Sequence, residues 1–537
     1  MRANRGATNS TAGIRWRLAA VTVAWTMSVL ASGSAYAAGA RVTIDSGVLE
    51  GAVADGVLSF KGIPYAAPPL GALRWKPPQP AAKWKGVREA TSYGPDCMQV
   101  PFPGDAAPLG VTPAEDCLYV NVWLPAGKRQ GALPVMVWIY GGGFVNGGSS
   151  PPVYDGSQFA KDGIALVSFN YRLGKLGFFS HPALSAEQPA FPAANYAIMD
   201  QVAVLKWVQR NIAAFGGDPH NVTIFGESAG GRSVNLLLAS SVSNGLFHKA
   251  IIESGGGRPG LFSQRRIEGP APDSAQSIGL ALGRQFGIEG QGAGALAKLR
   301  ALPAGQLALN MTMMSDPTYV GGPILDGKLN LGAATSVYAS GKGARVPVMI
   351  GANSADLGFM AVKTLDELFA AFHSQAEAAR RAYNPEHSTD LRSVSAKVGG
   401  DTSMVEPARE IARLLSARGQ PVYEYRFSYV AESLRATLAG APHATEIPFV
   451  FDTVAARYGK DLTAADEKAA KVMHQYWVAF AKTGTPQVAG EPQWPAYDAA
   501  HDRIMDFTNN GPVAGPDPWK VRLDLAQGLN ERLEKKR

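Results

Sequence analysis

The stretch Val222-Thr223-Ile224-Phe225-Gly226-Glu227-Ser228-Ala229-Gly230 decides the fold. Its first four residues are typical of a buried strand, and the run from Ser233 to Leu238 that follows it is typical of a helix. Glycines two positions before and after Ser228 allow a sharp turn between the two, because glycine tolerates backbone conformations that other residues avoid. The pattern predicts a nucleophile elbow, in which the Ser228 hydroxyl stands exposed at the start of a helix.

Further apolar runs bounded by turn residues alternate with helical patterns along the chain. Strands of a mostly parallel sheet are predicted at residues 134–140, 165–169, 222–225 and 346–350, with a helix at 200–212. The N-terminal runs at 42–44, 48–53, 57–60 and 118–124 alternate more like antiparallel strands at the sheet edge. Ala-rich helical stretches at 276–302 and 365–382 are candidate insertions over the active site. The order strand, helix, strand predicts an α/β fold with helices on both faces of the sheet.

The first 37 residues have the pattern of a secretory signal peptide. Four arginines and no acidic residue lie in or before an apolar run at 18–30, and small residues follow up to Ala37. The apolar run is too short to anchor the protein in a membrane. We therefore expect Sec-type export to the periplasm or the exterior, with no membrane anchor. Residues 38–537 contain no linker, repeat or low-complexity segment and are predicted to form a single domain.

The charge of the chain argues against nucleic acid as a partner. The net charge is +7, but without the four arginines of the predicted signal peptide 47 basic residues face 44 acidic ones, a net charge of +3. So small an excess without a long basic tract does not favour nucleic-acid binding. The chain has two cysteines, Cys97 and Cys117, which in an oxidising compartment suggest one disulfide, two buried thiols being the alternative. The sequence leaves the oligomeric state open.

An activated serine needs a base within hydrogen-bond reach and an acid that orients the base. In proteins with this elbow the acid and then the histidine follow the serine along the chain. Asp356 comes soon after the strand predicted at 346–350 and is the predicted acid. Of the five histidines after it, His443 lies in a loop between a strand predicted at 422–427 and the apolar run 447–451, and it is the predicted base. The others lie in helical or polar segments, namely His373, His387, His474 and His501.

The oxyanion of an acyl-transfer reaction needs preorganised N–H donors. Gly142 and Gly143 follow the strand predicted at 134–140 and lack side chains, so their amides can approach a substrate closely. The amide of Ala229 completes the predicted oxyanion hole, a merely flexible glycine loop being the alternative. This chemistry requires no metal ion and no organic cofactor.

Taken together, these segments resemble the type-B carboxylesterase family, the cholinesterase-like branch of the α/β-hydrolases. The resemblance covers nearly the whole predicted mature chain, and its landmarks are residues 60–66, 73–75, 115–123, 170–174, 215–219 and 477–485. It implies Ser228 as nucleophile, His443 as base and Asp356 as acid, where the family usually has glutamate. It also implies that Gly142, Gly143 and Ala229 are the oxyanion donors. Cys97 and Cys117 match the first disulfide of the family. Two structural ion pairs are implied as well, Arg74 with Glu115 and Arg172 with Asp200.

The chain also departs from the pattern of the family and of the cholinesterases within it. Leu357 and Ala444 stand where the family commonly has glycine, and no tryptophan lies between the two cysteines. In cholinesterases that segment carries an aromatic side chain that binds choline by a cation–π contact, so a choline ester is not the expected substrate.

The leading hypothesis is a secreted serine esterase that acts on a small-molecule carboxylic ester. A non-catalytic cholinesterase-like binding protein is the alternative from another class, and a lipase would need a larger apolar lid than the proline-containing segment 98–116 offers. In the family, the region that holds Arg258 and Leu261 borders the acyl pocket. An arginine there could recognise a carboxylate-bearing acyl group, which would suit polyanionic, tricarballylate-type esters such as fumonisin-like compounds.

Overall fold

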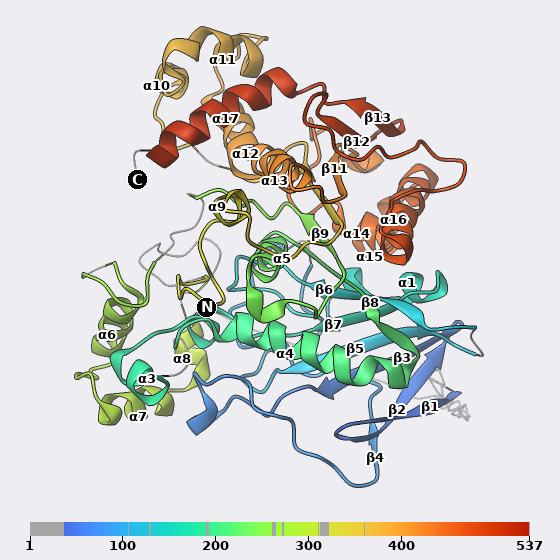
Figure 1. Ribbon diagram of the computed structural model, residues 1–537, viewed down its shortest axis with the longest axis vertical. Helices are drawn as coiled ribbons and strands as arrows, with labels where there is room; N and C mark the ends of the chain where they lie inside the picture. Colours follow the sequence, from blue (N-terminus) through green and yellow to red (C-terminus); the bar gives the residue numbers. More distant parts are fainter. Residues whose placement is uncertain are drawn as a thin grey trace, which may run out of the picture. The chain divides into compact units, whose positions relative to one another are not determined.

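The computed structural model describes residues 37–105, 107–127, 130–189, 193–259, 265–270, 273–309, 311, 322–358 and 360–535 (Figure 1). Two predictions therefore lie outside the described residues: the signal peptide, apart from Ala37, and the placement of Leu261. Within the described part of the chain, no helix is long and apolar enough to cross a membrane.

The described residues contain one sheet of 13 strands. Its order is β1-β2-β3-β5-β7-β6-β8-β9-β10-β11-β12-β13, with β4 beside β2. The strands are β1 (Ala37–Ile44), β2 (Gly47–Ala54), β3 (Val57–Pro64), β4 (Val87–Glu89), β5 (Tyr119–Pro125), β6 (Leu133–Ile139), β7 (Ala165–Phe169), β8 (Gly217–Glu227), β9 (Lys249–Glu253), β10 (Val348–Asn353), β11 (Val422–Phe427), β12 (Arg503–Thr508) and β13 (Gly511–Pro516).

Strand direction divides this sheet into a parallel centre and antiparallel edges. Neighbours from β7 to β12 run parallel. The steps from β1 to β7 through β2, β3 and β5 are antiparallel, which confirms the predicted N-terminal edge. The opposite edge is antiparallel as well, because β13 folds back on β12. The sequence analysis did not predict this second hairpin.

Helices connect the strands and cover the sheet. They are α1 (Ser157–Lys161), α2 (Gly174–Gly177), α3 (Pro182–Glu187), α4 (Tyr196–Asn211), α5 (Ala229–Ala239), α6 (Ala275–Gln285), α7 (Ala293–Ala301), α8 (Ala304–Ala308), α9 (Ala334–Ala339), α10 (Leu365–Ala370), α11 (Ala376–Tyr383), α12 (Leu391–Gly400), α13 (Glu406–Ser416), α14 (Ile447–Val450), α15 (Val454–Tyr458), α16 (Ala464–Thr483) and α17 (Lys520–Lys535). Every residue of β7, β9, β10 and β11 is buried. Since neighbouring side chains of a strand point to opposite faces, both faces of the central sheet are covered.

Each predicted helical stretch contains two helices. The first consists of α6 and α7, and α7 packs on α3. The second consists of α10 and α11, separated at His373, whose φ of 53° breaks the helix. Figure 1 shows α10 and α11 beside the C-terminal helix α17, well away from α6 and α7.

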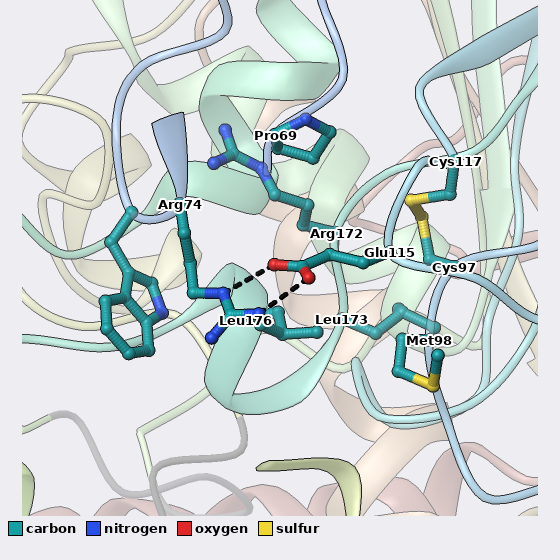
Figure 2. Close-up of a pocket in the computed structure, with 10 residues that line it drawn as sticks. Pro69, Arg74, Cys97, Met98, Glu115, Cys117, Arg172, Leu173 and Leu176 are labelled. Atoms are coloured by element: carbon teal, nitrogen blue, oxygen red, sulfur yellow. Dashed lines mark hydrogen bonds and ion pairs between the residues drawn. A yellow bond between two sulfur atoms is a disulfide. The ribbon is translucent and has the colours of Figure 1, made fainter. Parts of the chain in front are cut away.

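A disulfide joins Cys97 to Cys117 and closes the segment between them. Glu115 in this segment accepts two hydrogen bonds from the Arg74 guanidinium, at 2.5 and 2.6 Å. Figure 2 shows this ion pair and the disulfide beside a small cavity of about 10 Å³. The other ion pair implied by the resemblance, Arg172 with Asp200, also forms, at 2.7 Å. The disulfide thus joins the two ends of the segment to each other, and the Arg74–Glu115 ion pair fixes its second end to the body of the protein.

Candidate active site

Ser228 lies at the junction of β8 and α5, as the elbow pattern predicts. Its φ is 56°, a backbone conformation that a non-glycine residue adopts only when its surroundings impose it. The Ser228 amide donates to the Glu253 carbonyl at 2.9 Å, which ties the turn to the end of β9. Gly230 is required for the same packing, because a Cβ at that position would overlap the Ile139 carbonyl of β6. The half-buried Ser228 side chain thus stands at the N-terminus of α5.

His443 and Asp356 lie on two loops that are bonded to each other. Ala355 donates its amide to the Ala441 carbonyl at 2.9 Å, and Asn353 donates its side-chain amide to the Pro442 carbonyl at 2.7 Å. These bonds hold the loops that follow β10 and β11 side by side. Nδ1 of His443 consequently lies 2.6 Å from Oδ1 of Asp356.

The Asp356 carboxylate is buried and accepts several further hydrogen bonds. The donors are the backbone amides of Leu357 at 2.6 Å and Asn353 at 2.8 Å, and the Ser254 hydroxyl at 2.7 Å. Burial raises the pKa of Asp356, but the charge of His443 and these bonds outweigh it and hold the pKa below its ordinary value. Asp356 is therefore an ionised acid that can orient an imidazole. The sequence analysis did not predict the contact of Ser254 with Asp356, because the position of Ser254 after β9 does not indicate it.

A buried glutamate faces the other nitrogen of the imidazole. Oε1 of Glu227 lies 3.1 Å from Nε2 of His443, and among the described residues the Ser228 hydroxyl makes no hydrogen bond. Burial raises the pKa of Glu227 well above its ordinary value, while the charge of His443 opposes the rise. Burial lowers the pKa of His443, but the neighbouring carboxylates, Glu227 first and Asp356 second, outweigh it and raise that pKa to about 10. The sequence analysis did not assign a role to Glu227.

The glycine loop after β6 lies against the serine turn. A Cβ on Gly141 would lie 3.1 Å from the Cβ of Ser228. Gly142 and Gly143 both have positive φ, 96° and 64°. None of the amides of Gly142, Gly143 and Ala229 donates to an acceptor in the described part of the chain. Three amides beside a serine that find no acceptor among the described residues are suited to binding a negatively charged oxygen.

Arg258 has partners that the sequence analysis did not foresee. Its guanidinium donates to both oxygens of Glu406, at 2.5 and 2.7 Å, and to Glu534 at 3.1 Å. The side chain is only 8% exposed. The prediction that Arg258 is available to a substrate carboxylate is therefore wrong, because carboxylates of the protein already satisfy it. Arg258 does line a cavity of about 30 Å³, together with Arg232 of α5.

The remaining histidines after Asp356 have other surroundings. His373 and His387 are exposed, and His501 pairs with Asp498 at the surface. His474 is buried and contacts the Val450 carbonyl through Nδ1 at 2.7 Å. Within the described ranges no group of three His, Cys, Asp or Glu side chains is placed to hold a metal ion.

A serine at a strained turn between strand and helix, a histidine–aspartate pair beside it and a mostly parallel sheet define an α/β-hydrolase. The chain belongs to the carboxylesterase family, whose profile matches residues 38–516. It is therefore a carboxylic ester hydrolase.

Comparison with known proteins gives relatives that are named as esterases. Fumonisin B1 esterase of Sphingopyxis macrogoltabida is 36% identical over 501 residues, which cover 89% of this chain and 88% of that protein. Para-nitrobenzyl esterase of Bacillus subtilis is 36% identical over 477 residues, covering 85% and 92%. A solved structure of PNB esterase superposes with a TM-score of 0.76 at 32% identity and covers 91% of this chain and 99% of that one.

Proposed function

We propose that this chain is a secreted serine carboxylesterase that hydrolyses small-molecule esters through an acyl-enzyme, with the triad Ser228, His443 and Asp356. The observation that carries the proposal is the 2.6 Å contact between His443 Nδ1 and Asp356 Oδ1, beside the strained serine turn. An imidazole oriented through Nδ1 presents Nε2 as a base, which is what an activated serine needs. The disulfide supports export, since disulfides persist in oxidising compartments.

In the proposed reaction His443 takes the proton of Ser228 as Oγ attacks the ester carbonyl. The negative charge that develops on the carbonyl oxygen is received by the amides of Gly142, Gly143 and Ala229. His443 then gives its proton to the leaving alkoxide, and the same base activates a water that releases the acid. Nε2 must turn from Glu227 toward Ser228 for the first step, and catalytic hydrogen bonds often tighten only when substrate binds.

Labelling with a fluorophosphonate tests the assignment of the nucleophile. The native protein should incorporate one equivalent of reagent, and the peptide that carries the adduct should contain Ser228. Protein unfolded in urea before the reagent is added should not react, because the activated serine depends on the folded triad. An adduct on another residue, or no adduct on the native enzyme, would refute the proposal.

A second candidate function is hydrolysis of polyanionic esters, and the similarity to fumonisin B1 esterase favours it. Arg232 of α5 lines the same small cavity as Arg258, and it is the cation whose role this second candidate tests. Its amide donates to the Ser228 carbonyl at 2.8 Å, so it lies one helical turn after the nucleophile. Burial lowers the pKa of Arg232 to about 10, which leaves it charged at neutral pH. A charged guanidinium is suited to binding a carboxylate, which is the reason for testing Arg232.

Substitution of Arg232 and substitution of Arg258 should affect substrate specificity differently. Under the second candidate, Arg232→Gln should lower kcat/KM for a p-nitrophenyl hemisuccinate about 10- to 100-fold while changing p-nitrophenyl butyrate little. Arg258→Gln is the matched control, and it should lower the unfolding temperature without changing the ratio of the two rates, because its partners belong to the protein. Equal effects of Arg232→Gln on both esters would contradict the second candidate and favour a general esterase.

A further inference from the structure

Gln99 joins the segment closed by the Cys97–Cys117 disulfide to the glycine loop, here residues 140–150. It lies two residues after Cys97, and its side chain is buried. Nε2 donates to the Gly147 carbonyl at 2.6 Å and to the Cys97 carbonyl at 3.0 Å, while Oε1 accepts from the Gly147 amide at 2.8 Å. The carboxamide thus pairs with both polar groups of Gly147, which requires a donor and an acceptor on one side chain.

Gly147 in turn supports Gly142, one of the residues whose amide makes no hydrogen bond to the described residues. The amides of Val145 and Asn146 donate to the Gly142 carbonyl at 3.1 and 2.9 Å. Gly142 and Asn146 touch so closely that a Cβ on Gly142 would overlap the Asn146 carbonyl. The Asn146 side chain also donates to the Val100 carbonyl at 2.6 Å. A shift of Gly147 would therefore move Gly142.

The two ends of the glycine loop have different supports. At the start, the Tyr171 hydroxyl donates to the Tyr140 carbonyl at 2.8 Å. At the far end, Asp96 on the other side of Cys97 accepts from the Ser149 amide at 3.1 Å and from the Ser150 hydroxyl. The residues flanking Cys97 therefore hold the whole far end of the loop, and the disulfide fixes them in turn.

We propose that Gln99 is a positioning residue for catalysis, which fixes the Gly142 and Gly143 amides through Gly147. This inference rests on the proposed function, since it takes these amides to be the oxyanion donors. Such donors act mainly in the transition state, so displacing them should lower kcat and leave KM nearly unchanged. Removing one donor outright costs roughly 10²- to 10³-fold, and a displaced donor should cost less, about 10- to 100-fold.

The test replaces Gln99 by side chains of similar size. Gln99→Met removes the donor and the acceptor, and Gln99→Glu keeps an acceptor for the Gly147 amide while facing the Gly147 carbonyl with a carboxylate. Both should lower kcat about 10- to 100-fold with KM within about threefold. Both should also weaken a trifluoromethyl ketone, which forms a tetrahedral adduct with the serine, by the same factor as they lower kcat/KM.

A second buried glutamine provides the matched control. Gln420 is buried, and its Nε2 donates to the carbonyls of Ala344 and Val346 at the N-terminal ends of β10 and β11, opposite the site. Gln420→Met should lower the unfolding temperature but keep kcat and inhibitor affinity. The inference is overturned if a folded Gln99→Met or Gln99→Glu keeps wild-type kcat, or if inhibitor affinity does not follow kcat/KM. If Ser228→Ala also kept its activity, the proposed function itself would fail, whereas an inactive Ser228→Ala confines the failure to Gln99.

Discussion

Ser228→Ala should lower kcat for ester hydrolysis about 10⁶-fold and leave the fold intact. The hydroxyl makes no hydrogen bond in the described part of the chain, so its removal leaves no buried group without a partner. The strained turn depends on backbone contacts, such as the Ser228 amide with the Glu253 carbonyl, and alanine retains them. Steady-state rates with p-nitrophenyl butyrate and the unfolding temperature measure the two halves of the prediction.

Ser240→Ala is the control for this substitution. Ser240 follows the other end of α5, where its hydroxyl donates to the Lys328 carbonyl and accepts from the Val242 amide. Losing these two hydrogen bonds of the Ser240 hydroxyl should cost about 1 kcal/mol of stability, while kcat stays near wild type. Turnover by Ser228→Ala within tenfold of wild type would contradict the triad mechanism.

Local patterning predicted the centre of the sheet well. The strands predicted at 165–169 and 422–427 coincide with β7 and β11, because apolar and aromatic residues dominate both, although β11 also contains the buried Glu424 and Arg426. The hairpin of β12 and β13 was missed, since β13 contains Gly511, Pro512, Gly515 and Pro516, which are usually poor strand formers. Its pairing with β12 is a tertiary preference that propensity does not reveal.

In the candidate site too, some features could be predicted from the sequence and others could not. The strand before Asp356 and the loop around His443 were visible in the sequence, and their contact follows from parallel strands ending at one edge of the sheet. The contacts of Ser254 with Asp356 and of Glu227 with His443 join residues far apart in the chain, and no spacing pattern marks them. Arg258 was misassigned because its partners Glu406 and Glu534 lie 148 and 276 residues away.

His443→Ala should lower kcat nearly as much as the serine substitution, about 10⁶-fold, because none of the other histidines after Asp356 lies at the turn. Asp356→Asn should cost less, about 10⁴-fold, since the acid orients and stabilises the imidazolium without taking its proton. His501→Ala is the control: it removes another histidine paired with an aspartate, but His501 lies at the surface with Asp498 and should not change kcat. An active His443→Ala beside an inactive His501→Ala would show that the base was misassigned.

The pH profile gives this prediction a second readout. Only neutral His443 can accept the serine proton, and its raised pKa keeps the imidazole protonated to a higher pH than the roughly 6 to 7 usual for histidine. The rise of kcat/KM with pH should therefore lie above that range. Glu227→Gln removes one of the carboxylates that favour the imidazolium, so the pKa of His443 should fall and the rise should move to lower pH. A rise that stays in place or moves to higher pH in Glu227→Gln would exclude Glu227 as the cause, and one at 6 to 7 in the wild type would exclude the raised pKa itself.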